Sequence, residues 1–378
     1  MEKIKISVIT VSLNAEKTIE QTIKSVVSQN YDNIEYIIVD GASEDGTLDI
    51  VRKYEDNVAY WTSEPDDGVY DAMNKGLACC TGDIIAFLNS DDCYVEGAIK
   101  YVADFYENYK ETEVLCCEVL INKDGNKTSH YNAWEKYPEK LREGVMMYCH
   151  QGIFATRNCF ERYGFFDSKY KIAADYAWLL NIYNHDIQIC YSPQVVAEFG
   201  YGGLCTTEHF VTADEVEHIA IKAADDLLKN KKISRKEYIS LNQKIKKMAK
   251  KRYLNGYANL GDKKAVRIKS TVIEKKRLLE QKYSIFGMGE NGYNCLKVLQ
   301  KLGMQVDCLY DNNSLKWGKE VEGIIVKNPQ EILNSDSIVL VASQYYEEEI
   351  FNQMNEMGLL EGLNFMSCTE VCNWIEIV

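Results

Sequence analysis

The sequence lacks three features that would each assign it to a different class of protein. Its 378 residues contain no run of about 18 uncharged apolar residues, so no membrane-spanning helix is expected. Basic residues do not predominate, and a net charge of −14 argues against a protein that coats nucleic acid. None of the 13 cysteines forms a CxxC pair, which argues against zinc. The odd count and the absence of an export signal favour reduced thiols in the cytoplasm.

Short β-branched runs alternate with helical patterns in the first half of the chain. This alternation predicts an α/β fold with a mostly parallel sheet, whose ligands would lie beyond the carboxyl ends of the strands. The apolar segment Ile4–Leu13 has no small-residue cleavage site, so we interpret it as a buried strand and not as a signal peptide. The predicted strands are 6–11, 36–39, 84–88 and 114–120, and the predicted helices are 18–28, 47–54 and 69–77.

Composition divides the chain into three expected parts: a catalytic domain over 1–215, a connector over 216–282 and a second α/β domain over 283–378. The connector is rich in Lys and Arg, contains no proline over residues 222–282 and has a helical pattern. It is either a solvated helical linker or a basic face that docks on anionic lipid head groups. The second reading would place a cytoplasmic protein at the inner face of the membrane.

Acidic residues follow two of the predicted strands at the edge where ligands bind. Asp40 comes directly after the strand at 36–39, and Asp91 and Asp92 come just after the strand at 84–88. A single acidic turn is usually a helix cap or a solvated loop. Two such turns at one sheet edge instead suggest a site for Mg²⁺ or Mn²⁺, which bind through one or two carboxylates plus substrate phosphates.

Four motifs in order resemble inverting family 2 glycosyltransferases with the GT-A fold. The resemblance covers residues 4–205, and its motifs are Ser7–Asn14, Ile38–Thr47, Glu64–Gly76 and Thr81–Asp92. It implies a nucleotide-sugar-binding mixed sheet for this part of the chain. The basic helical connector would follow it, and the stretches Tyr310–Asn313 and Lys316–Gly318 separately resemble a small Rossmann-like C-terminal domain. The resemblance to family 2 also implies transfer of one sugar from a nucleotide sugar, usually a UDP sugar, to a saccharide or lipid-linked oligosaccharide in O-antigen or capsule assembly. The QxxRW motif of processive synthases is absent.

The resemblance also assigns roles to single residues. Asp40 would bind the nucleotide base, Asp91 would hold the metal, and Asp175 would act as general base. Asn89 replaces the first aspartate of the DxD motif, which would weaken metal binding unless Asp92 compensates. His150 either lines the donor-sugar pocket or is a structural histidine whose hydrogen bonds are made within the protein, beside an apolar segment. The remaining residues expected to contact the nucleotide sugar are Thr10, Asn14, Asp67 and Asn74.

The C-terminal part carries a separate motif. Gly287, Gly289 and Gly292 fit GxGxxG between a predicted strand and helix, and Asp311 follows at the end of the next strand. Three readings stay open: a binding or assembly module without catalytic activity, a nucleotide-binding module, and an NAD-dependent oxidoreductase. For the whole chain, the alternative to a transferase is a degenerate protein that only binds nucleotide sugar. A homo-oligomer is also left open.

Overall fold

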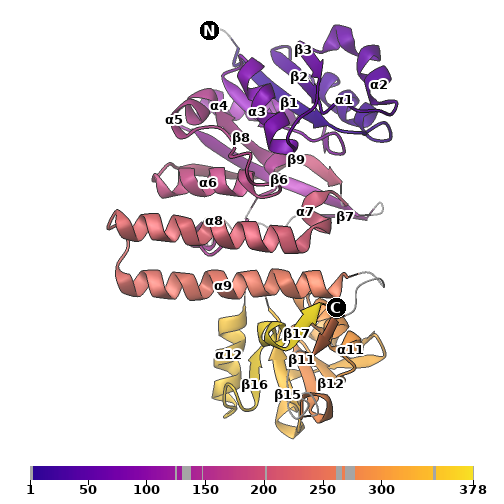
Figure 1. Ribbon diagram of the computed structural model, residues 1–378, viewed down its shortest axis with the longest axis vertical. Coiled ribbons are helices and arrows are strands. Elements are labelled where there is room, and N and C mark those ends of the chain that lie inside the picture. Colours follow the sequence, from indigo (N-terminus) through magenta and orange to yellow (C-terminus); the bar gives the residue numbers. More distant parts are fainter. Residues whose placement is uncertain are drawn as a thin grey trace. The chain divides into compact units, whose positions relative to one another are not determined.

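The computed structural model describes residues 3–123, 126–129, 138–146, 148–200, 202–260, 266–268, 277–343 and 346–377. The chain divides into two compact units, one of residues 1–207 and 214–245 and the other of residues 208–213 and 246–378. Two long helices, α8 (His209–Lys229) and α9 (Arg235–Ala258), run through the segment expected to be a helical connector (Figure 1). None of the helices in the described residues is both long and apolar enough to cross a membrane.

The first unit is built on a mixed sheet, as the sequence predicts. Strands β1, β2, β3 and β4 run parallel to one another, and β8 then pairs antiparallel with both β4 and β6. Among the described residues the strand order is β3-β2-β1-β4-β8-β6-β9-β5, with β7 beside β6. The strands are β1 (Ile6–Ser12), β2 (Ile34–Asp40), β3 (Tyr60–Ser63), β4 (Ile84–Phe87), β5 (Cys93–Tyr94), β6 (Val114–Lys123), β7 (Asn126–Ser129), β8 (Ile153–Thr156) and β9 (Ile189–Gly200).

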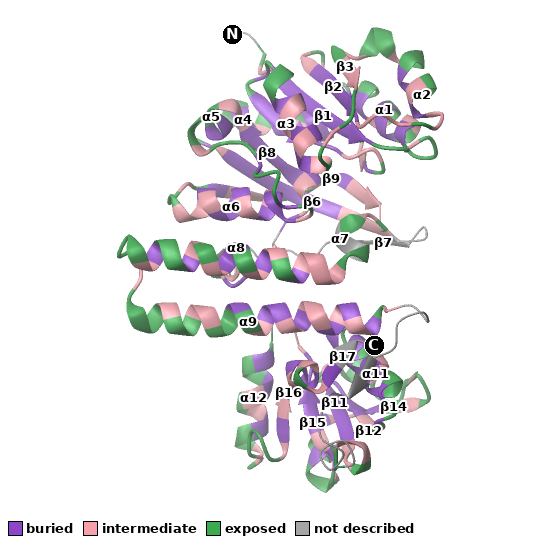
Figure 2. Ribbon diagram, in the orientation of Figure 1, coloured by how far each residue is buried: buried purple, intermediate pink, exposed green. Residues whose placement is uncertain are grey.

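Helices cover this sheet with apolar faces, and strands β1, β2 and β4 are buried along most of their length (Figure 2). Where α3 crosses β1 the packing is so close that a Cβ atom on Gly76 would lie 2.4 Å from Cγ2 of Ile9. The helices of this unit before α8 are α1 (Ile19–Val27), α2 (Thr47–Lys53), α3 (Val69–Cys79), α4 (Ala98–Asn108), α5 (Arg157–Tyr163), α6 (Ala174–Asn184) and α7 (Leu204–Thr207).

The second unit has its own sheet, of order β13-β14-β12-β11-β15-β16, in which every pair but β13–β14 is parallel. One apolar cluster lies on each face, because alternate residues of β11 such as Ile285 and Phe286 point to opposite sides. The elements are β11 (Lys282–Phe286), α11 (Glu290–Lys301), β12 (Gln305–Tyr310), β13 (Glu320–Val321), β14 (Ile324–Lys327), β15 (Ile338–Val341), α12 (Glu347–Glu356) and β16 (Phe365–Ser367), with β10 (Val266–Ile268) paired to β17 (Ile375–Ile377).

Candidate active site

Most of the polar side chains predicted from the sequence gather where β1, β2 and β4 end. These strands are parallel and adjacent, so their carboxyl ends share one edge of the sheet. The loop after β4 carries Asn89, Asp91 and Asp92, and the short helix η3 (His150–Gly152) carries His150. Asp175 lies in the first turn of α6. The edge therefore combines carboxylates, an amide and an imidazole.

Asp175 is held through one of its two carboxylate oxygens. Its Oδ1 accepts hydrogen bonds from the Tyr70 hydroxyl at 2.9 Å and from the backbone N–H of Tyr176 at 2.8 Å. Its Oδ2 lies 3.9 Å from Nδ1 of His150, and the side chain keeps 18% of its surface exposed. Oδ1 thus accepts two hydrogen bonds, whereas Oδ2 accepts none from the residues that the structure describes.

A second carboxylate, which the sequence analysis missed, fixes the backbone before α6. Glu215 of α8 accepts hydrogen bonds from the backbone N–H groups of Lys171, Ile172 and Ala173, at 2.7 to 3.0 Å. Tyr70, also missed, lies within the motif Glu64–Gly76, and its one hydroxyl hydrogen is shared between Oδ1 of Asp175 at 2.9 Å and the carbonyl oxygen of Ile172 at 2.6 Å. The loop that delivers Asp175 is therefore tied to two distant helices.

His150 lies between two carboxylates. Burial lowers the pKa of its imidazole, and the charges of Asp175 and Asp91 act in the opposite direction. Its Nε2 atom is buried and has no hydrogen-bond partner among the described residues. A buried polar atom without a partner is costly, so this nitrogen is suited to a ligand group. The arrangement favours the pocket-lining reading of His150 over that of a satisfied histidine.

Asp91 and Asn89 present oxygen atoms at the same loop. Burial raises the pKa of Asp91, and the nearby His150 opposes that effect. The Oδ1 atom of Asn89 is buried and, within the described part of the chain, accepts no hydrogen bond. Gly203 lies close by, since a Cβ atom there would be 3.7 Å from Oδ2 of Asp91. These two oxygen donors could contribute to a divalent metal site.

Asp92 points away from this site, although it follows Asp91 directly. It is fully buried, and its carboxylate accepts hydrogen bonds from Nε2 of Gln151 at 2.6 Å and from the N–H of Gly200 at 2.9 Å. Burial, together with the charge of Asp91, raises its pKa. Both oxygens of the Asp92 carboxylate are therefore occupied by the protein, which argues against the expectation that Asp92 compensates for Asn89 in metal binding. Its hydrogen bonds instead connect η3 to the end of β9.

Asp40 is buried at the end of β2 and has no free face in this conformation. Its carboxylate accepts hydrogen bonds from the hydroxyls of Ser12, Ser43 and Ser63 and from the N–H of Ser43, at 2.6 to 2.9 Å. These four bonds occupy the roughly four acceptor positions of a carboxylate. A base contact at Asp40 would have to replace one of them.

Asn14 and Thr10 differ in how they relate to the site. Asn14 is exposed, has a positive φ of 51°, and joins the loops after β1 and β2 through hydrogen bonds with Ser43 and Glu44. Thr10 is fully buried inside β1, where its hydroxyl accepts a hydrogen bond from Tyr36. Thr10 therefore does not reach the edge where a nucleotide would lie.

Asp67 lies just before α3, and Asn74 lies in the middle of that helix. Asp67 is exposed and its N–H donates to Asp71. Asn74 exchanges two hydrogen bonds with the backbone of Phe166, at 2.8 and 3.0 Å. Both ends of the Asn74 amide are thereby engaged in holding the loop before α6, a supporting role and not an open ligand contact.

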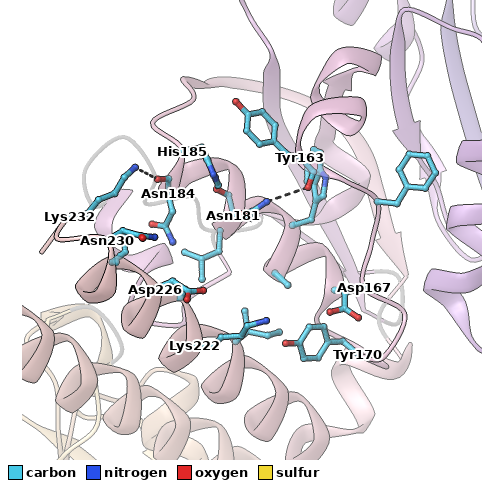
Figure 3. Close-up of a pocket in the computed structure, with 18 residues that line it drawn as sticks. Tyr163, Asp167, Tyr170, Asn181, Asn184, His185, Lys222, Asp226, Asn230 and Lys232 are labelled. Carbon is cyan, nitrogen blue, oxygen red and sulfur yellow. Dashed lines mark hydrogen bonds between the residues drawn. The ribbon is translucent and has the colours of Figure 1, made fainter.

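A hollow of about 440 Å³ in the first unit lies along α6 and α8 and does not include Asp175 among its lining residues. Figure 3 shows that α6 contributes Asn181 and Asn184 to it, that His185 follows directly after α6, and that α8 contributes Lys222 and Asp226. Its walls are a mixture of amide, charged and aromatic groups. This hollow is separate from the cluster around Asp175 and Asp91.

The C-terminal glycine motif and Asp311 lie together in the second unit. Gly287, Gly289 and Asp311 line one hollow, and Gly292 packs against the carbonyl of Gly287. These residues occupy the carboxyl ends of β11 and β12, as the sequence predicts.

Comparison with known proteins finds similarity to glycosyltransferases over the first unit. Residues 7–164 match the model of glycosyl transferase family 2, and residues 279–362 match the model named C2185-like, N-terminal. The crystal structure of Staphylococcus aureus TarS residues 1–349 is similar in fold, with a TM-score of 0.51 at 17% identity over 79% of this chain and 81% of that one. The first unit is therefore similar in sequence to glycosyl transferase family 2, and the fold of the chain is similar to that of TarS.

Curated relatives are also glycosyltransferases. An uncharacterized glycosyltransferase of Mycobacterium tuberculosis is 47% identical over 88 residues, which cover 23% of this chain and 34% of that protein. The PGL/p-HBAD biosynthesis glycosyltransferase of Mycobacterium bovis is 28% identical over 53% of this chain and 79% of its own length. The putative teichuronic acid biosynthesis glycosyltransferase TuaG of Bacillus subtilis is 39% identical over 26% and 41%. The first of these matches thus spans only about a third of the relative's length.

Proposed function

We propose that the chain transfers one sugar from a nucleotide sugar to a hydroxyl group of a saccharide or lipid-linked acceptor, with inversion at the anomeric carbon. The observation that carries this proposal is the Asp175 carboxylate, whose Oδ1 accepts hydrogen bonds from Tyr70 and Tyr176 and whose Oδ2 accepts none from the described residues. Its position beside the loop that carries Asp91 suits a base that acts next to a bound diphosphate. The similarity to glycosyl transferase family 2 supports the same reaction class.

In the proposed reaction the acceptor hydroxyl attacks the anomeric carbon in a single displacement. The new carbon–oxygen bond forms as the bond to the phosphate oxygen breaks, and the nucleoside diphosphate leaves with the electron pair. Oδ2 of Asp175 takes the proton of the attacking hydroxyl. General base catalysis of this kind contributes about 10²–10⁴-fold to the rate. Tyr70 and Glu215 act as positioning residues, since they hold the loop and the carboxylate.

A divalent metal fits the oxygen donors on the loop after β4. Asn89 Oδ1 is a buried acceptor that no described residue engages, and Asp91 adds a carboxylate. No group of three or more His, Cys, Asp or Glu side chains in the described residues could hold a metal alone. Mg²⁺ typically takes one or two protein ligands and completes its shell with phosphates and water. When bound, such an ion would neutralise charge on the leaving diphosphate.

We infer a UDP sugar as donor, with Asp40 and Asn14 near the nucleotide, and a cell-surface glycolipid or polysaccharide precursor as acceptor. The names of two relatives, for PGL/p-HBAD and teichuronic acid biosynthesis, support the acceptor class. The basic connector would hold the protein on anionic lipid at about 1 kcal/mol per well-placed Lys or Arg. Co-sedimentation of the full chain with phosphatidylglycerol vesicles at low salt tests this docking, and no binding would contradict it.

The donor is tested by thermal unfolding of the full chain with UDP, GDP, CDP and TDP, each with and without Mn²⁺. A ligand at about 100-fold excess over its Kd stabilises the folded state by about 2.7 kcal/mol, which is easily measured. We expect a metal-dependent shift with UDP that Asp91→Ala abolishes. Asp104→Ala, which changes an exposed acidic residue of α4 outside the loop after β4, is the control and should keep the shift. No shift with any nucleotide would contradict the proposal.

A further inference from the structure

The second unit has a hollow at the point where its chain reverses direction across the sheet. From β11 the chain proceeds to β12 and β14 on one side, and then returns to β15 and β16 on the other. In open parallel sheets, ligands bind outside the carboxyl ends of the strands at such a reversal. A hollow of about 580 Å³ lies there, within the size range of small-molecule sites.

Two of the three motif glycines are required by the fold of the unit itself. Gly287 has a φ of +98°, and a Cβ atom there would lie 3.1 Å from the carbonyl oxygen of Ala342. A Cβ atom on Gly292 would lie 2.1 Å from the carbonyl oxygen of Gly287. Only glycine therefore lets α11 begin directly against the loop that follows β11.

Gly289 is different, because nothing in the described part of the chain calls for glycine there. Its φ is −90°, and a Cβ atom would meet no atom of the structure within 4 Å. It is the residue before the first turn of α11, and it lines the hollow. The missing side chain leaves open the approach to the N-terminal N–H groups of the helix, where anions bind.

Asn291 supplies an independent sign of a ligand at the same place. It lines the hollow, is only 6% exposed, and its Nδ2 atom has no hydrogen-bond partner among the residues that the structure describes. A buried donor of this kind costs free energy unless something accepts its hydrogen bond. The start of the 12-residue helix α11 and the Asn291 amide together offer several donors to one anionic group.

Asp311 faces the hollow from the end of β12. Its carboxylate accepts hydrogen bonds from the N–H groups of Met288 and Asn313 and from Nζ of Lys316, each at 2.8 Å. One of its roughly four acceptor positions is left for a hydroxyl group. Lys316 also donates to the carbonyl of Met288 at 3.0 Å, so one of the three N–H groups of its ammonium can still donate to a ligand.

The other lining groups limit the charge of the ligand. Glu290, Glu349 and Asp311 outnumber the cation Lys316, which disfavours a ligand as highly charged as a nucleoside triphosphate. Phe286 and Ile350 provide apolar wall for a base. A pyrophosphate diester carries one negative charge on each phosphate, which is less than the charge of a triphosphate. In nucleotides it is bonded to a ribose that carries a base.

We propose that the second unit binds a nucleotide built on a pyrophosphate diester, with the pyrophosphate at the start of α11 and a ribose hydroxyl at Asp311. NAD⁺ and UDP-glucose share this chemistry. The proposal does not depend on the transferase activity, because it concerns the residues of the second unit alone.

Hydrogen–deuterium exchange of the full chain tests the proposal, because it locates the ligand by segment and so separates the two units. NAD⁺, UDP-glucose, ATP and inorganic phosphate are the probes. We expect NAD⁺ or UDP-glucose to slow exchange over residues 287–293 and 311–316. Slowing by none of the probes, or the same slowing by inorganic phosphate alone, would overturn the proposal. Stronger slowing by ATP than by either diester would overturn the charge argument.

Two matched variants on α11 sharpen the test. Asn291→Leu removes a donor without a partner, so the protein should remain as stable as wild type while affinity falls at least about tenfold, as expected for one charge-assisted hydrogen bond. Asn294→Leu, one turn later, removes a hydrogen bond to Asn255 and should lower stability while affinity is retained. Undiminished binding by a folded Asn291→Leu protein would overturn the assignment.

Discussion

The hydrogen-bonded carboxylate of Glu35 allows a quantitative prediction for the first unit. Glu35 lies on β2, and its carboxylate accepts hydrogen bonds from Lys5, Ser7 and Thr81 at 2.5 to 2.6 Å. These bonds link β1, β2 and the turn before β4. Burial alone would raise the pKa of Glu35, but the hydrogen bonds outweigh it and lower the pKa to about 2.

The lowered pKa of Glu35 determines how much its ionised carboxylate stabilises the folded state and how that stabilisation changes with pH. A fall from 4.5 to about 2 corresponds to at most about 3 kcal/mol of stability at neutral pH. Lys5 is 36% exposed, so solvent screening reduces this figure, and we expect Glu35→Gln to cost about 2 kcal/mol. Because the folded-state pKa of Glu35 is lowered, its contribution is complete above the ordinary pKa and is lost as the pH falls toward 2.

Urea unfolding of the full chain, followed by amide exchange in β1 and β2, measures this free energy for the first unit. The matched control is Asp104→Asn, which breaks an exposed ion pair with Lys100 and should cost less than about 0.5 kcal/mol. The difference between wild type and Glu35→Gln should shrink as the pH is lowered from 5 toward 2. A Glu35→Gln protein as stable as the control at pH 7, or a difference that grows in acid, would refute the reasoning.

Three further substitutions test other parts of the first unit. Tyr70→Phe should lower kcat while the KM for the donor is unchanged, since the hydroxyl positions Asp175; equal losses in both would indicate a general folding defect. Gly76→Ala should destabilise by about 1–3 kcal/mol, despite alanine's higher helix propensity, because of the clash with Ile9; a more stable protein in thermal unfolding would contradict this. Gln151→Leu should cost about 1–3 kcal/mol by removing a donor to Asp92, and an unchanged melting temperature would argue against that bond.

Local patterns in the sequence were enough to predict the elements that build the site. The strand predicted at 36–39 lies within β2, and the helix predicted at 69–77 corresponds to α3, because apolar periodicity reports which side of an element is buried. The same reasoning placed Asp40 and Asp91 at one edge of the sheet, because each follows the carboxyl end of a strand and the carboxyl ends of parallel strands lie at the same edge.

Contacts between distant residues could not be predicted in this way. Asp91 and Asp92 are neighbours in a polar motif, yet only the tertiary partners Gln151 and Gly200 decide that Asp92 is buried. Glu215 binds the loop before Asp175, but it lies outside residues 4–205, which resemble the glycosyltransferase family. No motif in the sequence around it therefore indicated this role. Composition therefore identified the residue types of the site, and packing determined which of them face a ligand.

The central claim is that Asp175 is the base for sugar transfer, and Asp175→Asn tests it most directly. Asparagine keeps an Oδ1 atom for Tyr70 and Tyr176 but replaces Oδ2 with an amide that cannot take a proton. The assay is release of the nucleoside diphosphate from the donor sugar, paired with the thermal shift given by the same nucleotide. We predict an unchanged shift and a rate lower by about 10²–10⁴-fold. A folded Asp175→Asn protein that releases the nucleotide at the wild-type rate would contradict the account.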